Sequence, residues 1–297
     1  MMSGNRSTSG AVLVIGATGT IGRELIRELR LRGQHVRAGT REPLGASQHS
    51  DASTEWIRFD YHVEETFAPA LVGVERVFMI LPPGDNTADI PATPFIHRMR
   101  DMNIRAVVDL SAMGAESNPS MAVRKVELLL ENSEITVTHL RPNWFMQIFT
   151  TGSLQKQVRG GKLSFPAGRA RISYIDARDI AAAAAIALTE PGHGGKAYTL
   201  TGPAALDHFE ISRILSEAAC HVVIYEPNTD DQAREALTEV GMALAQRERL
   251  IAFYRFVRQG FCEPVKPDLV NILGREPTSF AQFALDYAQE WRRKQGP

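Results

Sequence analysis

The sequence has little cysteine, little net charge and no long apolar run. Cys220 and Cys262 are the only cysteines among 297 residues, and neither belongs to a CxxC pair. This scarcity argues against a disulfide framework, so we expect two core thiols in a reducing compartment. The formal net charge of −1 provides no electrostatic attraction to nucleic acid, and no nucleic-acid partner is expected.

The chain also lacks the apolar segments of signal peptides and membrane spans. Its first residues, MMSGNRSTSG, are polar and rich in Gly and Ser, which predicts a flexible tail over 1–10. The longest apolar helical stretch, residues 179–191, is too short and too rich in alanine to cross a bilayer. We therefore expect a cytoplasmic protein without a membrane partner.

Strand and helix patterns alternate through the first half of the chain. This alternation is typical of an α/β fold with a doubly wound parallel sheet, the Rossmann arrangement, covered on both faces. Short apolar strands are predicted over residues 11–16, 35–41, 56–60, 76–83, 105–114 and 135–142, and helices over 20–33, 94–103 and 121–133.

The pattern loosens after Pro142. A short strand is expected at the start of residues 172–192, followed by a helix with Asp179 as its N-cap, and another strand at 197–202. From about residue 203 the pattern is mostly helical. We therefore predict a dinucleotide-binding domain over 11–155 and a smaller, partly interleaved and mostly helical substrate-binding region over 156–297.

A glycine-rich loop joins the first predicted strand to the first predicted helix. Its spacing is G-x-x-G-x-x-G, a pattern that allows a tight turn, close approach of a pyrophosphate and close packing of helix on strand. The N–H groups and dipole at the start of the helix favour the anion. The cofactor contacts predicted here are Gly16, Thr18, Gly19, Thr20, Ile21 and Gly22.

The end of the second strand favours NADP(H), with NAD(H) left open. NAD sites usually place a carboxylate at this point for the ribose 2′-hydroxyl, whereas this chain reads Gly39-Thr40-Arg41. Arg41, helped by Thr40 and Arg37, can bind a 2′-phosphate, although solvated arginines would give the same pattern.

Three further residues are placed at strand ends around the predicted cofactor. Asp60 can accept a hydrogen bond from the adenine amino group or can cap a helix. Leu81 and Pro82 are expected to flank the cofactor where it turns toward the crevice of the sheet.

Several segments together resemble the NmrA-like branch of atypical short-chain dehydrogenases. They are GATGTIGREL, LRPNWFMQIF, ISYIDARDIAAAAAIAL, GKAYTLTGP and LGREPTSFAQFALDYAQEW, and they cover nearly the whole chain. The branch includes NADPH-dependent quinone reductases, iminium reductases of the ergot-alkaloid type and cofactor-binding regulators without catalysis. The sequence departs from it at Cys220, where a glycine usually leads into the next strand.

The resemblance implies a substrate that lies over the nicotinamide. It also implies that Ser111 has a place near the reacting atoms and the cofactor, although a serine there can simply satisfy a turn. The implied substrate contacts are Met113, Met121, Asn143, Trp144, Phe145 and Met146, of which the aromatic residues and methionines can equally be core.

The chain lacks the tyrosine of the Tyr-x-x-x-Lys pair that protonates an alkoxide in ordinary short-chain dehydrogenases. Counting from Lys125 places Met121 at the tyrosine position, and Lys125 would then contact the cofactor. Counting from Glu127 places Pro119 and Val123 at the two positions. Neither register supplies a phenol, so the favoured substrates are those whose reduction forms no localised alkoxide.

Three functions are compatible with these features. The first is an NADPH-dependent oxidoreductase acting on a small iminium ion, quinone or enone, in secondary metabolism or redox housekeeping. The second is a non-catalytic NADP(H)-binding redox sensor with a regulatory protein partner, and the third a cofactor-assisted isomerase or cyclase. A homo-oligomer is left open, no metal-ligand spacing is evident, and the catalytic candidates are Ser111, Lys125 and Tyr174.

Overall fold

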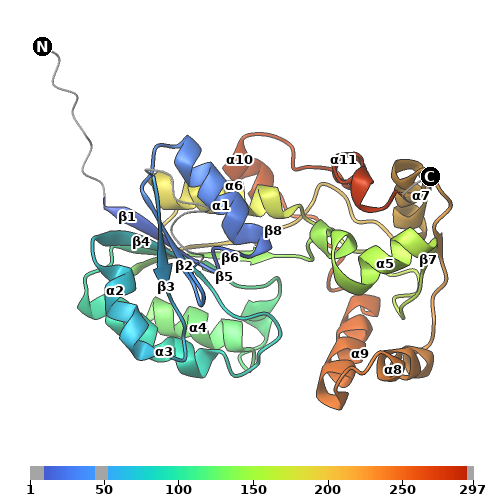
Figure 1. Cartoon of the computed structure of the whole chain (residues 1–297), viewed down its shortest axis with the longest axis horizontal. Coiled ribbons are helices and arrows are strands. Elements are labelled where there is room, and N and C mark those ends of the chain that lie inside the picture. Colours follow the sequence, from blue (N-terminus) through green and yellow to red (C-terminus); the bar gives the residue numbers. More distant parts are fainter. Residues whose placement is uncertain (1–9, 44–52, 293–297) are drawn as a thin grey trace, which may run out of the picture. The chain divides into compact units, whose positions relative to one another are not determined.

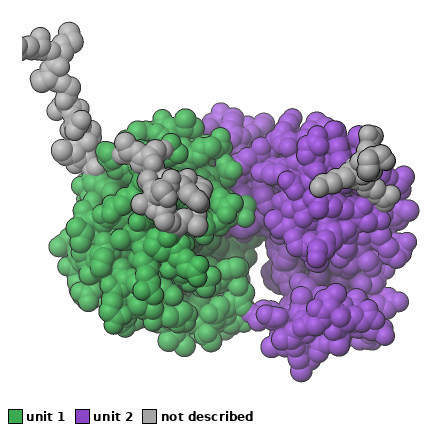
Figure 2. Space-filling model, viewed as in Figure 1, with its two compact units in different colours: residues 1–141, 180–199 green, residues 142–179, 200–297 purple. Residues whose placement is uncertain are grey.

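The computed structural model describes residues 10–43 and 53–292. The predicted tail over 1–10 falls, except for Gly10, outside the described residues. The chain divides into two compact units, coloured in Figure 2. Unit 1 comprises residues 1–141 and 180–199, and unit 2 comprises residues 142–179 and 200–297. The predicted boundary near residue 155 stays a prediction.

Unit 1 is built around a seven-stranded sheet, which confirms the predicted fold class. The strand order is β3-β2-β1-β4-β5-β6-β8, and every pair from β3 through β6 is parallel. The chain adds β2 and β3 on one side of β1 and then adds β4 and the later strands on its other side. Ligands of doubly wound folds bind at this switch point, at the carboxyl ends of the strands. The strands are β1 (Ala11–Ile15), β2 (Val36–Thr40), β3 (Thr54–Arg58), β4 (Val74–Ile80), β5 (Ala106–Leu110), β6 (Thr136–Pro142) and β8 (Lys196–Leu200).

Helices cover both faces of this sheet because each carries one apolar stripe (Figure 1). In α1, Leu25 and Leu29 lie one turn apart and are fully buried. The other face packs into an apolar cluster with residues such as Phe95 and Val126. The helices concerned are α1 (Thr20–Leu31), α2 (Phe67–Leu71), α3 (Asp89–Asp101), α4 (Ala122–Glu131) and α6 (Ala177–Thr189), with the 3₁₀ turns η1 (Glu64–Thr66) and η2 (Ala115–Ser117). Helix α3 begins five residues before the predicted start at residue 94.

Unit 2 is mostly helical, as predicted, and has its own aromatic core. Trp291, Phe149 and Phe283 are among its fully buried side chains. Its elements are η3 (Met146–Thr150), α5 (Gly152–Gly160), β7 (Lys162–Leu163), α7 (His208–Ala219), β9 (Ile224–Tyr225), α8 (Asp230–Glu239), α9 (Leu244–Arg258), α10 (Asp268–Leu273), α11 (Phe280–Asp286) and η4 (Ala288–Glu290).

Two expectations for unit 2 are wrong. The strand predicted at residue 172 is reduced to isolated bridges, Ile172 with Leu206 and Phe145 with Ile175. Cys262 is buried, but Cys220 is exposed and is not a core thiol. Cys220 ends α7 with a φ of 56°, a left-handed conformation that favours glycine, which accounts for the glycine that the family usually has there.

Candidate functional site: a phosphate loop and a strand edge without a phenol

The glycine loop has the geometry of a pyrophosphate cradle. Gly16 adopts a φ of +71°, and its carbonyl oxygen accepts a hydrogen bond from the Gly19 N–H at 2.9 Å. A Cβ on Gly22 would overlap that same oxygen and lie 2.9 Å from Cα of Ala17. Gly19, the N-cap of α1, receives no side-chain cap, and the first turn holds no acidic residue, so the helix start can accept an anion.

The end of β2 leaves Arg41 available for a phosphate but not Arg37. Thr40 is half-buried, and Arg41 is exposed without an ion-pair partner among the described residues. Arg37 instead lies 2.7 Å from Glu55 Oε2 and donates to the carbonyl of Pro69. The suggestion that Arg37 assists a 2′-phosphate contact is therefore wrong, because its guanidinium is already engaged beside β3.

The remaining strand-end candidates lie where their strands end. Asp60 closes a turn, with Oδ1 accepting from the His62 N–H at 3.0 Å and its own N–H donating to Thr66 Oγ1. The carboxylate of Asp60 is therefore partly used for local structure, and its contact with adenine stays a proposal. Leu81 is buried directly after β4, whereas Pro82 is exposed.

Helix α4 presents no phenol in either register. Lys125 is exposed, and its Nζ lies 3.2 Å from Asp89 Oδ2 at the start of α3. Val123 is half-buried and packs against the apolar core, and Glu127 one turn later is fully buried. This face of α4 is therefore turned toward the sheet, which favours the register with Val123 at the lysine position. A cofactor contact of Lys125 remains a prediction.

Ser111 lies at the carboxyl end of β5, beside a buried charged network. Burial raises the pKa of Glu127, but hydrogen bonds from Arg141 and Arg124, together with the nearby Ser111 hydroxyl, lower that pKa to about 2. Ser111 Oγ nevertheless makes no hydrogen bond of good geometry, although it is buried. An unpaired buried hydroxyl is costly unless it serves a ligand, so a role for Ser111 stays a proposal.

Two of the implied substrate-binding residues already contact other residues of unit 2. Asn143 is buried, its Nδ2 donates to Ser173 Oγ at 2.7 Å and to the Cys262 carbonyl at 2.8 Å, and its Oδ1 accepts from the Trp144 N–H. The Asn143 amide has no donor left for a substrate. Trp144 is only half-buried and stacks on Phe253 of α9, with ring centroids 3.9 Å apart.

The other implied substrate contacts differ in exposure. Met146 is buried in the core of unit 2, the role expected of a gap-filling methionine. Phe145 is half-buried in unit 2, and Met113 and Met121 are half-buried in unit 1. We retain Met113, Met121, Trp144 and Phe145 as proposed substrate contacts and set Asn143 and Met146 aside as core.

Tyr174 is a core residue of unit 2. Its hydroxyl lies 2.9 Å from Nε2 of His208, and its ring packs edge-on against Phe149. Burial raises the pKa of Tyr174 well above its ordinary value, and burial lowers the pKa of His208 to about 3. Both groups are therefore neutral at pH 7, and the placement favours the structural role of Tyr174 over the catalytic one.

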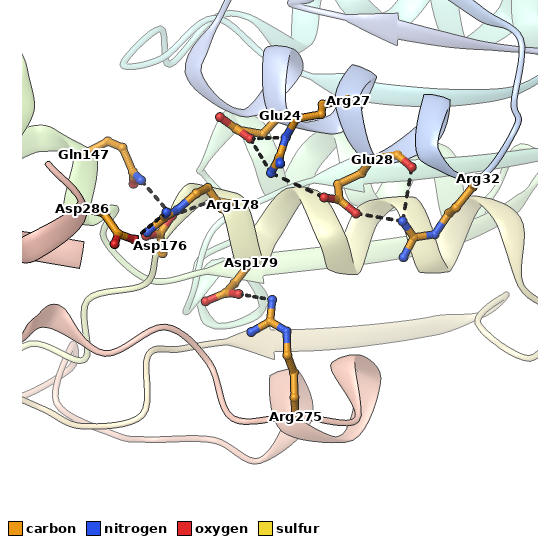
Figure 3. Close-up of polar contacts among 10 residues, drawn as sticks. All are labelled: Glu24, Arg27, Glu28, Arg32, Gln147, Asp176, Arg178, Asp179, Arg275 and Asp286. Atoms are coloured by element: carbon orange, nitrogen blue, oxygen red, sulfur yellow. Dashed lines mark hydrogen bonds and ion pairs between the residues drawn. The ribbon is translucent and has the colours of Figure 1, made fainter. Parts of the chain in front are cut away.

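The segment YIDARDIA, residues 174–181, leads into α6, and its charged side chains make their contacts with residues of unit 2 (Figure 3). Asp176 is fully buried, and its Oδ1 accepts from the Arg178 N–H and from Gln147 Nε2, both at 2.8 Å. Arg178 in turn lies 2.7 Å from Asp286 Oδ2. Asp176 thus takes the capping position that was predicted for Asp179.

Asp179 has a different partner. Its Oδ1 accepts from Arg275 at 2.7 Å (Figure 3). Its Oδ2 accepts from the Thr278 N–H. The sequence pattern therefore identified a capped helix start correctly but named the wrong aspartate, because both carboxylates precede the alanine-rich run.

The fold and the glycine loop together define a dinucleotide-binding oxidoreductase-type protein. A family model described as NAD(P)H-binding matches residues 16–191. The match covers more than half of the sequence, so the chain belongs to this NAD(P)H-binding family. The predicted cofactor class is thereby confirmed.

Relatives confirm the resemblance to reductases of the atypical short-chain type and the oxidoreductase class. NAD(P)H azoreductase of Xenophilus azovorans is 29% identical, with 93% of this chain and 98% of that protein covered. Agroclavine dehydrogenase of Claviceps purpurea (strain 20.1) is also 29% identical, with coverages of 84% and 90%. The solved structure of Citrobacter sp. triphenylmethane reductase is 25% identical, with a TM-score of 0.82 and coverages of 93% and 99%.

Sequence reasoning missed the charged network between β5, α4 and β6. Neither Asp109 nor His139 is among the site candidates of the sequence analysis, yet Asp109 Oδ2 lies 3.0 Å from His139 Nδ1. The available signal was two buried polar residues at matching positions of adjacent strands. Among the described residues, no helix is long and apolar enough to cross a membrane.

Proposed function

We propose that this protein is an NADPH-dependent reductase of a small, flat, conjugated and electron-poor acceptor: an iminium ion, a quinone, an enone or an azo compound. The observation that supports this class most is that, within the described residues, no phenol stands at either candidate tyrosine position. Met121 or Pro119, depending on the register, stands where a tyrosine-dependent enzyme needs an acid, and the hydroxyl of Tyr174 is buried against His208. The names of the azoreductase and of the triphenylmethane reductase agree with such acceptors.

The chemistry follows from where the charge goes. When bound, the dihydronicotinamide would supply a hydride, that is, one proton together with two electrons, to form a new bond to hydrogen on the acceptor. An iminium ion becomes a neutral amine, so no proton donor is needed. A quinone or enone gives a delocalised anion that water can protonate. The protein must therefore mainly hold the cofactor, orient the flat acceptor and exclude competing reactions.

The residues that would hold the cofactor follow the carboxyl ends of neighbouring strands of the sheet. The glycine loop would bind the pyrophosphate, and Arg41 with Thr40 would bind the 2′-phosphate. Leu81, which is buried, would line the turn of the cofactor toward the nicotinamide. Ser111 is the polar group best suited to meet the nicotinamide end, because its buried hydroxyl has no well-aligned partner within the described residues.

Arg41→Ala should weaken NADPH binding about tenfold to a hundredfold, since a charge-assisted hydrogen bond contributes about 1.5–3 kcal/mol. NADH lacks the 2′-phosphate, so its affinity should change less than about threefold. Titration of both cofactors by fluorescence measures the effect. Arg37→Ala is the matched control, because Arg37 is engaged with Glu55, and it should leave the ratio of the two affinities unchanged. Equal losses for both cofactors in Arg41→Ala would remove Arg41 from the site.

The proposed activity is tested by NADPH oxidation with a panel of acceptors. Cyclic iminium ions, quinones, enones, azo dyes and triphenylmethane dyes should include substrates, whereas unconjugated ketones should not be reduced. Turnover restricted to simple ketones would contradict the proposal. Tight NADPH binding without turnover of any acceptor would favour the sensor function instead.

A further inference from the structure

A polar cluster in unit 1 joins α4 to β5 and β6, with Asp109, Glu127 and His139 buried and Glu131 exposed at its edge. Glu127 and Glu131 lie one turn apart on α4, so their carboxylates project from the same face of the helix. Nη1 of Arg124 lies 2.7 Å from Glu127 Oε2 and 2.8 Å from Glu131 Oε1. The guanidinium thus sits where two carboxylates converge, and one of them, Glu131, also approaches the imidazole of His139 on β6.

His139 is arranged as metal-binding histidines usually are. Its Nδ1 lies 3.0 Å from Oδ2 of Asp109, its register partner on β5, and with Asp109 ionised this contact favours the proton on Nδ1. Nε2 then carries the lone pair. It is buried without a hydrogen-bond partner and lies 3.6 Å from Glu131 Oε1. Carboxylates that accept from the outer nitrogen are the common supports of histidine ligands to zinc.

We propose that Glu127, Glu131 and His139 form a binding site for a divalent transition metal, Zn²⁺, which enters by displacing the guanidinium of Arg124. Nitrogen and oxygen ligands at about 2.0–2.1 Å in a tetrahedron are separated by about 3.4 Å. The 3.6 Å between His139 Nε2 and Glu131 Oε1 is close to that spacing. A neighbouring trio that shares two of these ligands but does not include Glu131, formed by Asp109, Glu127 and His139, places one ligand atom each within 4.8 Å of the others.

The charges of the cluster favour the exchange. Arg141 holds Glu127 through Nε to Oε1 and Nη2 to Oε2, both at 2.8 Å, and its Nη1 lies 3.4 Å from Glu116 Oε2. Four carboxylates, those of Asp109, Glu116, Glu127 and Glu131, therefore face only two guanidiniums. Zn²⁺ in place of Arg124 adds one positive charge where the surplus is negative. When Arg124 leaves, Glu127 Oε2 regains a lone pair for the metal while Arg141 keeps the carboxylate oriented.

Zinc titration of the tag-free full-length chain tests the site. Wild type, Arg124→Leu and Arg124→Leu/His139→Phe are stripped with a chelator and titrated with Zn²⁺ against a chromogenic competitor. Arg124→Leu should bind one equivalent at least tenfold more tightly than wild type, because the competing cation is gone. The added His139→Phe change should abolish this binding, whereas His97→Phe, at an exposed histidine of α3, should not.

Cobalt provides a second readout that does not depend on the folding of the Arg124 variants. Co²⁺ added to wild type should give d–d absorption of a tetrahedral nitrogen and oxygen site, and both Glu131→Gln and His139→Phe should remove it. Circular dichroism monitors the fold of each variant. The proposal is overturned if folded Arg124→Leu binds no stoichiometric Zn²⁺, or if binding survives the loss of His139.

Discussion

Gly22→Ala abolishes NADPH binding, at least a hundredfold in the dissociation constant, and destabilises unit 1 by about 1–3 kcal/mol or more. The reason is the absence of any space for a Cβ. That atom would overlap the carbonyl oxygen of Gly16 and lie 2.9 Å from Cα of Ala17, both of which are backbone. The loop must therefore move away from α1, which displaces the N–H groups that would meet the pyrophosphate. Isothermal titration with NADPH and urea unfolding measure the two effects.

Gly19→Ala is the matched control at the same loop. Its Cβ would lie 3.1 Å from Gly16 O, a tight contact that a small backbone shift relieves, so the protein should stay folded. Gly19 is exposed, so its added methyl group would obstruct the pyrophosphate directly without displacing the loop. A loss of NADPH affinity in Gly19→Ala would therefore come from this obstruction and not from unfolding. If Gly22→Ala bound NADPH as wild type does, the loop geometry described above would be wrong.

Replacing His208 with Phe makes the protein less sensitive to acid. Burial lowers the pKa of His208 to about 3 in the folded chain, while the ordinary value is 6.5. The unfolded chain therefore takes up a proton below pH 6.5 that the folded chain refuses, and stability falls as the pH drops. Between pH 7 and pH 5 this linkage costs wild type about 2 kcal/mol, at about 1.4 kcal/mol for each pH unit below 6.5. The loss continues toward pH 3.

Urea unfolding at pH 7 and pH 5 measures this difference. His208→Phe should lose about 2 kcal/mol less stability than wild type over the interval. Its absolute stability at pH 7 should fall because the Tyr174 hydroxyl loses its partner. Tyr174→Phe, which keeps the buried histidine, should retain the acid sensitivity. An identical pH dependence in wild type and His208→Phe would mean that His208 becomes protonated inside the fold.

The sheet and the glycine loop could be predicted because their signals are local. A short continuous apolar segment, such as residues 11–16, indicates a strand from its own sequence. The loop glycines at 16 and 22 are likewise required by backbone contacts between residues close in the sequence. The N-cap of α6 shows the limit of such signals. Asp176 and Asp179 stand three residues apart, and only the packing of Gln147 and Arg275 distinguishes their roles.

The charged cluster could not be predicted from spacing. Asp109, Glu127 and His139 come from three elements, and they meet because β5 and β6 pair with Asp109 opposite His139 while α4 packs over both strands. Tyr174 is similar, since its burial depends on His208 from α7. Cys220 is exposed and ends α7 in a left-handed backbone conformation, which a cysteine at this position does not predict. Such features depend on register and packing between distant segments.

The pH dependence of hydride transfer tests the central claim most directly. NADPH is mixed with a quinone, whose reduction takes up a proton, and single-turnover rates are recorded from pH 6 to pH 9 for wild type and Tyr174→Phe. A reductase that needs no acid should give a flat profile in both proteins, with a primary isotope effect from NADPH deuterated at C4. The phenol of Tyr174 stays protonated over this range, because burial raises its pKa. A rate that Tyr174→Phe lowers strongly at every pH would therefore contradict the account and restore a phenol as the proton donor.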